Sequence, residues 1–100
     1  MYRGTTPTFS FSLPMDSSTI TALNLCFAQQ NTIVLEKTLA DCTREGNTLH
    51  VRLTEQETLL FDARKGIVEM QLRVGCGETK MASNIMQVSV KKILKDGCLA

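Results

Sequence analysis

The stretch that decides the fold is Gly66-Ile67-Val68-Glu69-Met70-Gln71-Leu72-Arg73-Val74. Apolar side chains occupy its even positions from 68 to 74, and polar side chains occupy the odd positions between them. A period of two is typical of a β-strand with one buried face, because successive side chains of a strand point to opposite sides. The stretch therefore predicts a half-buried strand over residues 67–74.

The residues after this strand predict that the chain turns back on itself. Gly75-Cys76-Gly77-Glu78 contains two glycines, which tolerate the positive φ of a tight turn. Residues 79–90 then resume the alternation and place Met86, Val88 and Val90 on one face. We therefore expect a β-hairpin with Cys76 exposed in its turn.

Four earlier segments carry strand patterns and are expected to be partners of this hairpin. Three of them alternate apolar and polar side chains. The fourth, residues 32–37, is rich in β-branched residues and follows the turn-prone residues 29–31. In the fourth, Ile33, Val34 and Leu35 are consecutive, so its pattern leaves open which face is buried. The predicted strands are Thr8–Leu13, Ile20–Ala28, Thr32–Lys37 and Thr48–Leu53.

The remaining segments are predicted to connect these strands. Residues 39–45 form a polar connection, and Gly46-Asn47 is a turn signal before the next strand. Thr54-Glu55-Gln56-Glu57 matches a capping box, in which a threonine oxygen and a glutamate three residues later satisfy orphan amides, so a single helical turn is expected there. Residues 59–61 are apolar and are expected to supply part of a seventh strand.

The predicted fold class is an all-β, immunoglobulin-like antiparallel β-sandwich of about seven strands with one short helical turn. Two sheets packed face to face bury the inward side chains of every strand. The predicted core consists of Phe9, Phe11, Leu13, Leu23, Leu25, Phe27, Leu49, Val51, Leu53, Val68, Met70, Leu72, Met86, Val88 and Val90.

Length and composition are those of one globular domain spanning residues 1–100, with residues 1–7 as a lead-in and residues 91–100 as a tail. The chain is 43% hydrophobic and 21% charged, and its net charge of +1 comes from interleaved signs, which disfavours steering of polyanions. The sequence lacks both the apolar run of a secretory signal and that of a membrane span. We therefore expect a cytoplasmic protein with no membrane partner.

No residue constellation predicts a catalytic, cofactor or metal site. His50 is the only histidine and falls on a predicted outward face between Leu49 and Val51. Gly75-x-Gly77 precedes no helix that could present amides to a phosphate. The four cysteines lack paired metal-ligand spacing and an export signal, so they are expected to be reduced thiols. These cysteines are Cys26, Cys42, Cys76 and Cys98.

The predicted surface is polar but carries few charges. Lys91, Lys92 and Lys95 form a small basic end, but most of the five aromatic residues belong to the core, so no nucleic-acid partner is expected. The outward threonine, serine, asparagine and glutamine side chains fit either a solvated sheet or a face shared with another protein chain. These side chains are Thr8, Ser10, Ser12, Asn24, Gln71, Gln87 and Ser89.

The order of these segments resembles the amino-terminal immunoglobulin-like domain of bacteriophage baseplate upper proteins. The resemblance is carried by Gly46-Asn47, the strand after it and Thr54-Glu55-Gln56-Glu57-Thr58. The start, Arg3-Gly4-Thr5-Thr6-Pro7 before Phe9-x-Phe11, is similar to that of small prophage proteins encoded among tail genes. Unlike antibody domains, the chain has no tryptophan and no cysteine in residues 67–74 to pair with Cys26.

The resemblance implies a non-enzymatic module of a phage or prophage particle, associated with the tail or baseplate. Its partners would be other phage structural proteins or further copies of itself, met in the cytoplasm of a bacterial host. An alternative from another class is a binding protein for a small ligand or a host factor, held in the loops at residues 41–47 and 75–78.

Overall fold

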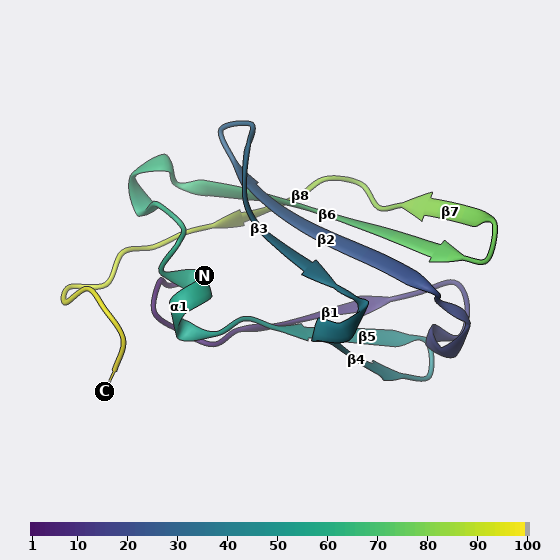
Figure 1. Cartoon of the computed structure of the whole chain (residues 1–100). Helices are drawn as coiled ribbons and strands as arrows, with labels where there is room; N and C mark the ends of the chain where they lie inside the picture. Colours follow the sequence, from purple (N-terminus) through teal and green to yellow (C-terminus); the bar gives the residue numbers. More distant parts are fainter. Residues whose placement is uncertain (100) are drawn as a thin grey trace.

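The computed structural model describes residues 1–99 and confirms the β-sandwich. Two antiparallel sheets, one of three strands and one of five, pack face to face (Figure 1). Short 3-10 turns occupy Ser17–Thr19, Leu39–Asp41 and Ala63–Lys65. The strands and the helix are β1 (Thr8–Ser12), β2 (Ala22–Gln29), β3 (Thr32–Thr38), β4 (Cys42–Glu45), β5 (Thr48–Arg52), α1 (Glu55–Thr58), β6 (Ile67–Cys76), β7 (Thr79–Ala82) and β8 (Met86–Ser89).

The sheet topology is that of an immunoglobulin-like domain. The strand orders are β1-β5-β4 in the smaller sheet and β3-β2-β6-β7 in the larger sheet, where β8 also pairs with β6. Immunoglobulin domains order their strands A-B-E-D and C′-C-F-G. Matching β1 to B, β2 to C, β3 to C′, β4 to D, β5 to E, β6 to F and the β7–β8 segment to G reproduces every neighbour. Within residues 1–99, no strand occupies the A position beside β1.

The structure differs from the prediction in two segments, one in the smaller sheet and one in the connection after it. Residues 42–45 form strand β4, where a connection was expected, because the turn at Gly46-Asn47 folds them back onto β5 as a hairpin. Residues 59–61 form a turn and not a seventh strand. Their apolar character reflects burial of Phe61, which is 1% exposed and joins the core.

The predicted hairpin forms, but its details differ at two places. Cys76 pairs with Thr79, so it ends β6 and lies half-buried, and the turn is only Gly77-Glu78. Gly77 has a φ of 60°, which suits glycine. The expected strand over residues 79–90 divides into β7 and β8 because Ser83 interrupts the pairing: its hydroxyl oxygen accepts a hydrogen bond from the Leu72 amide at 3.0 Å.

The buried face of β3 is settled by a bulge. Gln30 and Asn31 both have positive φ and form the two-residue turn from β2. Phe27 then pairs with Leu35 and Ala28 with Ile33, so the register shifts by one residue between them. Ile33 therefore points outward, and Lys37 points inward.

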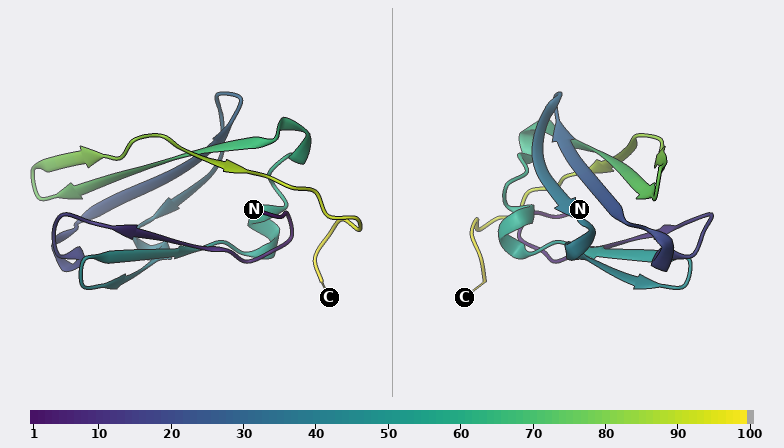
Figure 2. Two further views of the ribbon diagram at one scale, coloured as in Figure 1. Left: turned by 180° about the vertical axis from the view of Figure 1, so that it is seen from behind. Right: turned by 45° about the vertical axis from the view of Figure 1, so that its right-hand side comes forward.

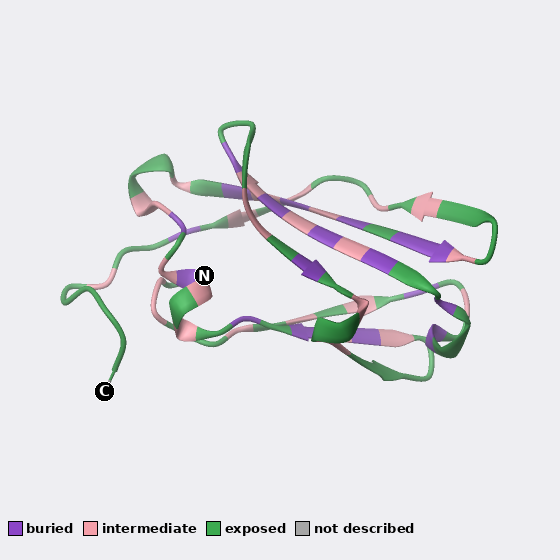
Figure 3. Cartoon of the chain, in the orientation of Figure 1, coloured by how far each residue is buried: buried purple, intermediate pink, exposed green. Residues whose placement is uncertain are grey.

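The predicted core residues at the centre of the sandwich are buried, whereas those along one side are more exposed than predicted. Buried residues alternate along β2 and β6 in Figure 3, as a period of two requires. Ile20, Phe61 and Val74 join this core. The predicted core residues Phe9, Phe11, Met86 and Val88 are only partly buried, because they lie on β1 and β8, at the rims of the sandwich.

Three phenylalanines hold the two sheets and their connection together. Phe27 of β2 is fully buried, and its ring centroid lies 5.9 Å from that of Phe9 on β1 and 5.8 Å from that of Phe61. Tilted pairs at this separation are favourable beyond the apolar area that they bury. In antibody domains a buried tryptophan lies on strand C, and Phe27 is a buried aromatic residue of β2, the strand in the C place here.

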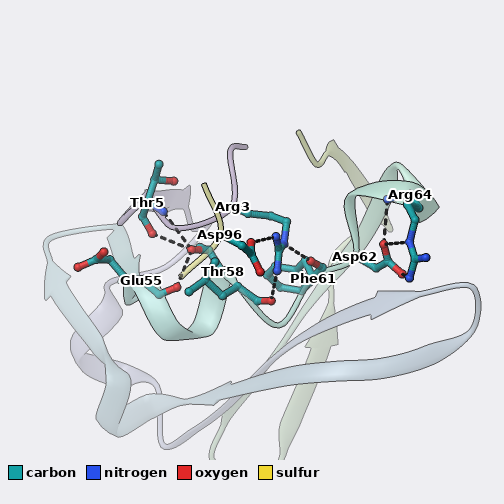
Figure 4. A network of polar contacts seen from close by, with 9 residues as sticks. Arg3, Thr5, Glu55, Thr58, Phe61, Asp62, Arg64 and Asp96 are labelled. Atoms are coloured by element: carbon teal, nitrogen blue, oxygen red, sulfur yellow. Dashed lines mark hydrogen bonds and ion pairs between the residues drawn. The ribbon is translucent and has the colours of Figure 1, made fainter. Parts of the chain in front are cut away.

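Polar contacts fasten the chain ends to the connection between β5 and β6 (Figure 4). Arg3 donates hydrogen bonds to the carbonyls of Leu59 at 2.9 Å and Phe61 at 2.7 Å, and it forms an ion pair with Asp96. The buried Thr58 donates to the Thr5 carbonyl at 2.9 Å. Tyr2 also forms an isolated parallel bridge with Lys91, two residues beyond the end of β8.

An inward ion pair joins β3 to the predicted helical turn, which is confirmed as α1. Thr54 and Glu57 form both bonds of the capping box, and the Glu57 carboxylate also contacts the Lys37 ammonium. Burial raises the pKa of Glu57, but the hydrogen bond from Lys37 and that from the Thr54 amide outweigh burial and leave this pKa below its usual value. The pair therefore stabilises the fold while Glu57 is ionised.

We predict that Glu57→Gln lowers the free energy of unfolding by about 2 kcal/mol at pH 7, because it leaves Lys37 without a counter-ion while keeping the cap. A group whose pKa is lowered by folding stabilises above its unfolded pKa, here the ordinary value of 4.5, and stops doing so as the pH falls through its folded pKa. In urea unfolding from pH 7 downwards, the difference in stability between the unaltered chain and Glu57→Gln should therefore be full at pH 7 and shrink as the pH falls below 4.5. The double variant K37M/E57Q is the control and should regain stability at pH 7; an equal loss in both variants would contradict the prediction.

Candidate functional site

A cleft opens on the side of the sandwich where the A position is vacant. Figure 2 shows β1 at the rim of one layer, on the same side as β7 and β8 in the other. The cleft between these rims has a volume of about 420 Å³. It is lined by Ser10, Phe11, Ser12, Leu13, Pro14, Leu72, Val74, Met81, Ala82, Ser83 and Met86.

The chemistry of this lining is apolar and adaptable. None of the lining side chains carries a charge, and the larger ones are aliphatic, aromatic or thioether groups. Phe11, Met81 and Met86 pack against the core but are only partly buried. Methionine side chains are flexible and polarisable, so they adjust to different apolar surfaces. The cleft suits an apolar side chain inserted from outside.

The edge of β1 beside the cleft has free backbone groups, and the register identifies them. Leu53 donates its amide to the Pro7 carbonyl at 3.0 Å, and Leu13 donates its amide to the Asn47 carbonyl at 2.7 Å. In an antiparallel pair, hydrogen-bonded positions alternate with non-bonded ones. The odd residues of β1 therefore bond to β5, and the amides and carbonyls of Thr8, Ser10 and Ser12 face away from it.

The free edges of the sandwich differ in charge. The edge strands β3, β4 and β7 contain charged residues, namely Glu36 and Lys37, Arg44 and Glu45, and Lys80. Three strands border the cleft: β7 contains Lys80, whereas β1 and β8 contain no charged residue. Charges on an edge strand oppose pairing with a further strand. The two strands without this protection border the same cleft.

The outer face of the smaller sheet brings together a serine, a histidine and a glutamate. Ser10 Oγ lies 2.7 Å from Nδ1 of His50, and His50 Nε2 lies 3.7 Å from the Glu45 carboxylate. The sequence predicted outward positions for both His50 and Ser10, but it did not bring the two side chains together. Only the pairing of β1 with β5, in which Ser10 is opposite His50, reveals this contact.

This trio differs from a Ser-His-acid triad in its geometry. In such triads the serine bonds to Nε2, and a buried carboxylate bonds to Nδ1 and holds the ring. Here the serine is on Nδ1, and the Glu45 side chain is 84% exposed, where water screens its charge. The arrangement is that of cross-strand polar pairs on a solvated sheet face.

The four cysteines are free thiols and lie on β2, β4, β6 and the tail after β8. Burial is the main cause that raises the pKa of Cys26, and the negative charge of Glu36 is the second. Burial is likewise the main cause that raises the pKa of Cys42, and the negative charge of Asp41 is the second. A raised pKa lowers the thiolate fraction and hence the nucleophilicity at neutral pH. Cys98 is exposed in the tail.

The remaining sequence-based candidates are scattered over the fold. Residues 1–99 hold no cluster of three or more potential metal ligands and no helix long and apolar enough to cross a membrane.

The basic end and the loops of the alternative ligand site make contacts within the fold. Lys91 lies over the Tyr2 ring, with Nζ 5.7 Å from the ring centroid. In the loops of the alternative ligand site, Asp41 accepts the Thr38 amide at 2.9 Å, and Arg44 donates to the carbonyls of residues 17 and 20.

No protein-family model, curated protein or solved structure matches this chain in the comparisons made with it.

We predict that the contact between the Ser10 and His50 side chains contributes to the stability of the fold as a cross-strand polar pair. A double-mutant cycle with Ser10→Ala and His50→Ala should give a coupling free energy of about 0.5 kcal/mol, measured by urea unfolding at pH 7. Thr8→Ala is the control, because Thr8 is opposite Arg52 and not His50. It should not couple to His50→Ala; additive effects of Ser10→Ala and His50→Ala would contradict the assignment.

Proposed function

We propose that this chain is a non-enzymatic protein–protein interaction module of a phage or prophage particle, associated with its tail or baseplate. The observation that carries the interaction role is the free, uncharged edge of β1 beside an apolar cleft. The surface that docks is the open side of the sandwich, defined as β1, β7, β8 and the cleft between them.

The proposed mode of binding is the addition of a β-strand. An extended segment laid along β1 would bond through its backbone to Thr8, Ser10 and Ser12. Every second side chain of that segment would point into the cleft, towards Phe11, Met81 and Met86. Backbone bonds supply affinity in this mode, and the pockets for alternate side chains supply specificity.

The assignment to a phage particle is supported by the resemblance described above, on Gly46-Asn47, residues 54–58 and the Arg3–Pro7 start. Assembly into a particle requires a chain to present a surface for other chains, and the open side of this sandwich fits that requirement. The fold alone serves many functions, so the site, and not the sandwich, carries the proposal.

The alternative of a ligand or host-factor site in the loops has less support. Asp41 binds the start of its own 3-10 turn, and Arg44 binds carbonyls of residues 17 and 20. Thr21 donates its amide to the Gly75 carbonyl at 2.8 Å. These three polar groups are engaged within the fold, so fewer groups of the loops remain to recognise a ligand.

We predict that the open side contacts a structural protein of the particle. A photo-crosslinking phenylalanine analogue at Ala82, an exposed residue that lines the cleft, should give one discrete adduct in particles purified on a density gradient from the induced host strain. The same analogue at Lys65, an exposed residue away from the cleft, is the control and should give none.

Two results would contradict this proposal. If the chain is found in other gradient fractions than the particles, the virion role is wrong. Adducts of equal yield from positions 65 and 82 would show that the open side is not the docking surface.

A further inference from the structure

We infer that the open side binds a second copy of this chain, with β1 pairing antiparallel to the second β1 about a two-fold axis at Ser10. The inference rests on the proposed function, since it names one partner for the same surface. The two smaller sheets would join into one continuous sheet with the order β4-β5-β1-β1-β5-β4.

The sequence of β1 is self-complementary. Thr8-Phe9-Ser10-Phe11-Ser12 has the same pattern in both directions about Ser10, with Thr8 standing for Ser12. A two-fold contact requires that each residue meet the same partner on both copies. Antiparallel pairing centred on Ser10 meets this requirement, since Ser10 faces Ser10, Phe9 faces Phe11 and Thr8 faces Ser12.

The free backbone groups fit this register. Thr8, Ser10 and Ser12 present their amides and carbonyls at the open edge, and in this register each of them is directly opposite another such residue. Directly opposite residues with facing groups exchange two hydrogen bonds, so the ladder would contain roughly six. Pro7 and Pro14 lack amide donors and flank the ladder, which limits it to β1.

The side chains also fit on both faces. The phenylalanines would form the non-hydrogen-bonded pairs, in which side chains lie closest, on the inner face where Phe9 and Phe11 are now only partly buried. On the outer face the paired residues are hydroxyl side chains without charge, so no repulsion opposes the contact.

The larger sheets would add contacts to this ladder. Opposite residues of an antiparallel pair point to the same face, so both larger sheets would lie on one side of the joined sheet. The two clefts would then open towards each other, with Met81 and Met86 of each copy above the phenylalanines. A five-residue ladder buries less than the roughly 800 Å² per partner of a standard interface, so we expect association in the micromolar range.

We predict that the molar mass measured by light scattering rises from monomer to dimer between low and high micromolar concentration. Ser10→Pro should raise the dissociation constant at least tenfold, because it removes an amide that faces the open edge and none that bonds to β5. Ser10→Ala separates the loss of the hydroxyl from the loss of the amide: it loses the same hydroxyl contact with His50 but keeps the amide, so it should raise the dissociation constant less than Ser10→Pro does.

A second variant covers the case in which Ser10→Pro fails to fold. Ser10→Lys keeps every backbone group and places two like charges opposite each other at the axis, so it should weaken the dimer at low salt and recover part of the affinity at high salt. A monomer at all concentrations, or equal association of the proline, lysine and alanine variants, would overturn the self-pairing.

The two proposals fail separately. A monomeric chain that still forms the adduct from position 82 in particles would overturn self-pairing and leave the interaction module standing. A dimer that separates from the particles would overturn the virion role and leave self-pairing standing.

Discussion

The packing of Phe27 is the contact on which the rest of the structure depends. This side chain is fully buried in the larger sheet, and it meets Phe9 from the smaller sheet and Phe61 from the connection that crosses between the sheets. Next to it, Gln29 donates to the Asp62 carbonyl at 2.9 Å and accepts the Asp62 amide at 2.8 Å. One end of β2 thus fixes the distance between the layers and the path of the chain between them.

The same packing leaves one edge of the fold open. Phe9 holds β1 to the core through its inner face, and β5 holds it through one edge, so nothing in this arrangement requires a strand on the other edge. In an immunoglobulin domain that place belongs to strand A. Here residues 1–3 bond to Lys91, just beyond β8, and the Arg3 side chain bonds to the connection before β6. The open side is therefore a consequence of where the lead-in is anchored.

Alternation along the chain was enough to predict most strands and their buried faces. Leu23, Leu25 and Phe27 lie inward as expected, and the Thr54–Glu57 capping box forms the expected helical turn. Local pattern failed where pairing decides the structure. Residues 42–45 have no apolar alternation and become a strand because the turn after them places them beside β5. Residues 79–90 alternate but are divided at Ser83, whose hydroxyl bonds to the neighbouring strand.

The candidate site was less predictable than the fold, because it depends on which strands are neighbours. The sequence identified outward serines and threonines, but it could not show that β1 is an edge strand. It also could not show that Ser10 lies beside His50, since that contact joins residues 40 positions apart. Both facts follow from the register of β1 on β5, which the pattern of one strand does not contain.

The central claim is that the amides of Thr8, Ser10 and Ser12 lie on an open edge that a further strand covers. Amide hydrogen exchange, resolved by residue with NMR at low and high protein concentration, tests it most directly. We expect the amides of Phe9, Phe11 and Leu13 to be protected at both concentrations, and those of Thr8, Ser10 and Ser12 to exchange fast at low concentration and slowly at high concentration. Equal protection of all six amides at low concentration would contradict the claim, because the edge would then be covered within the single chain.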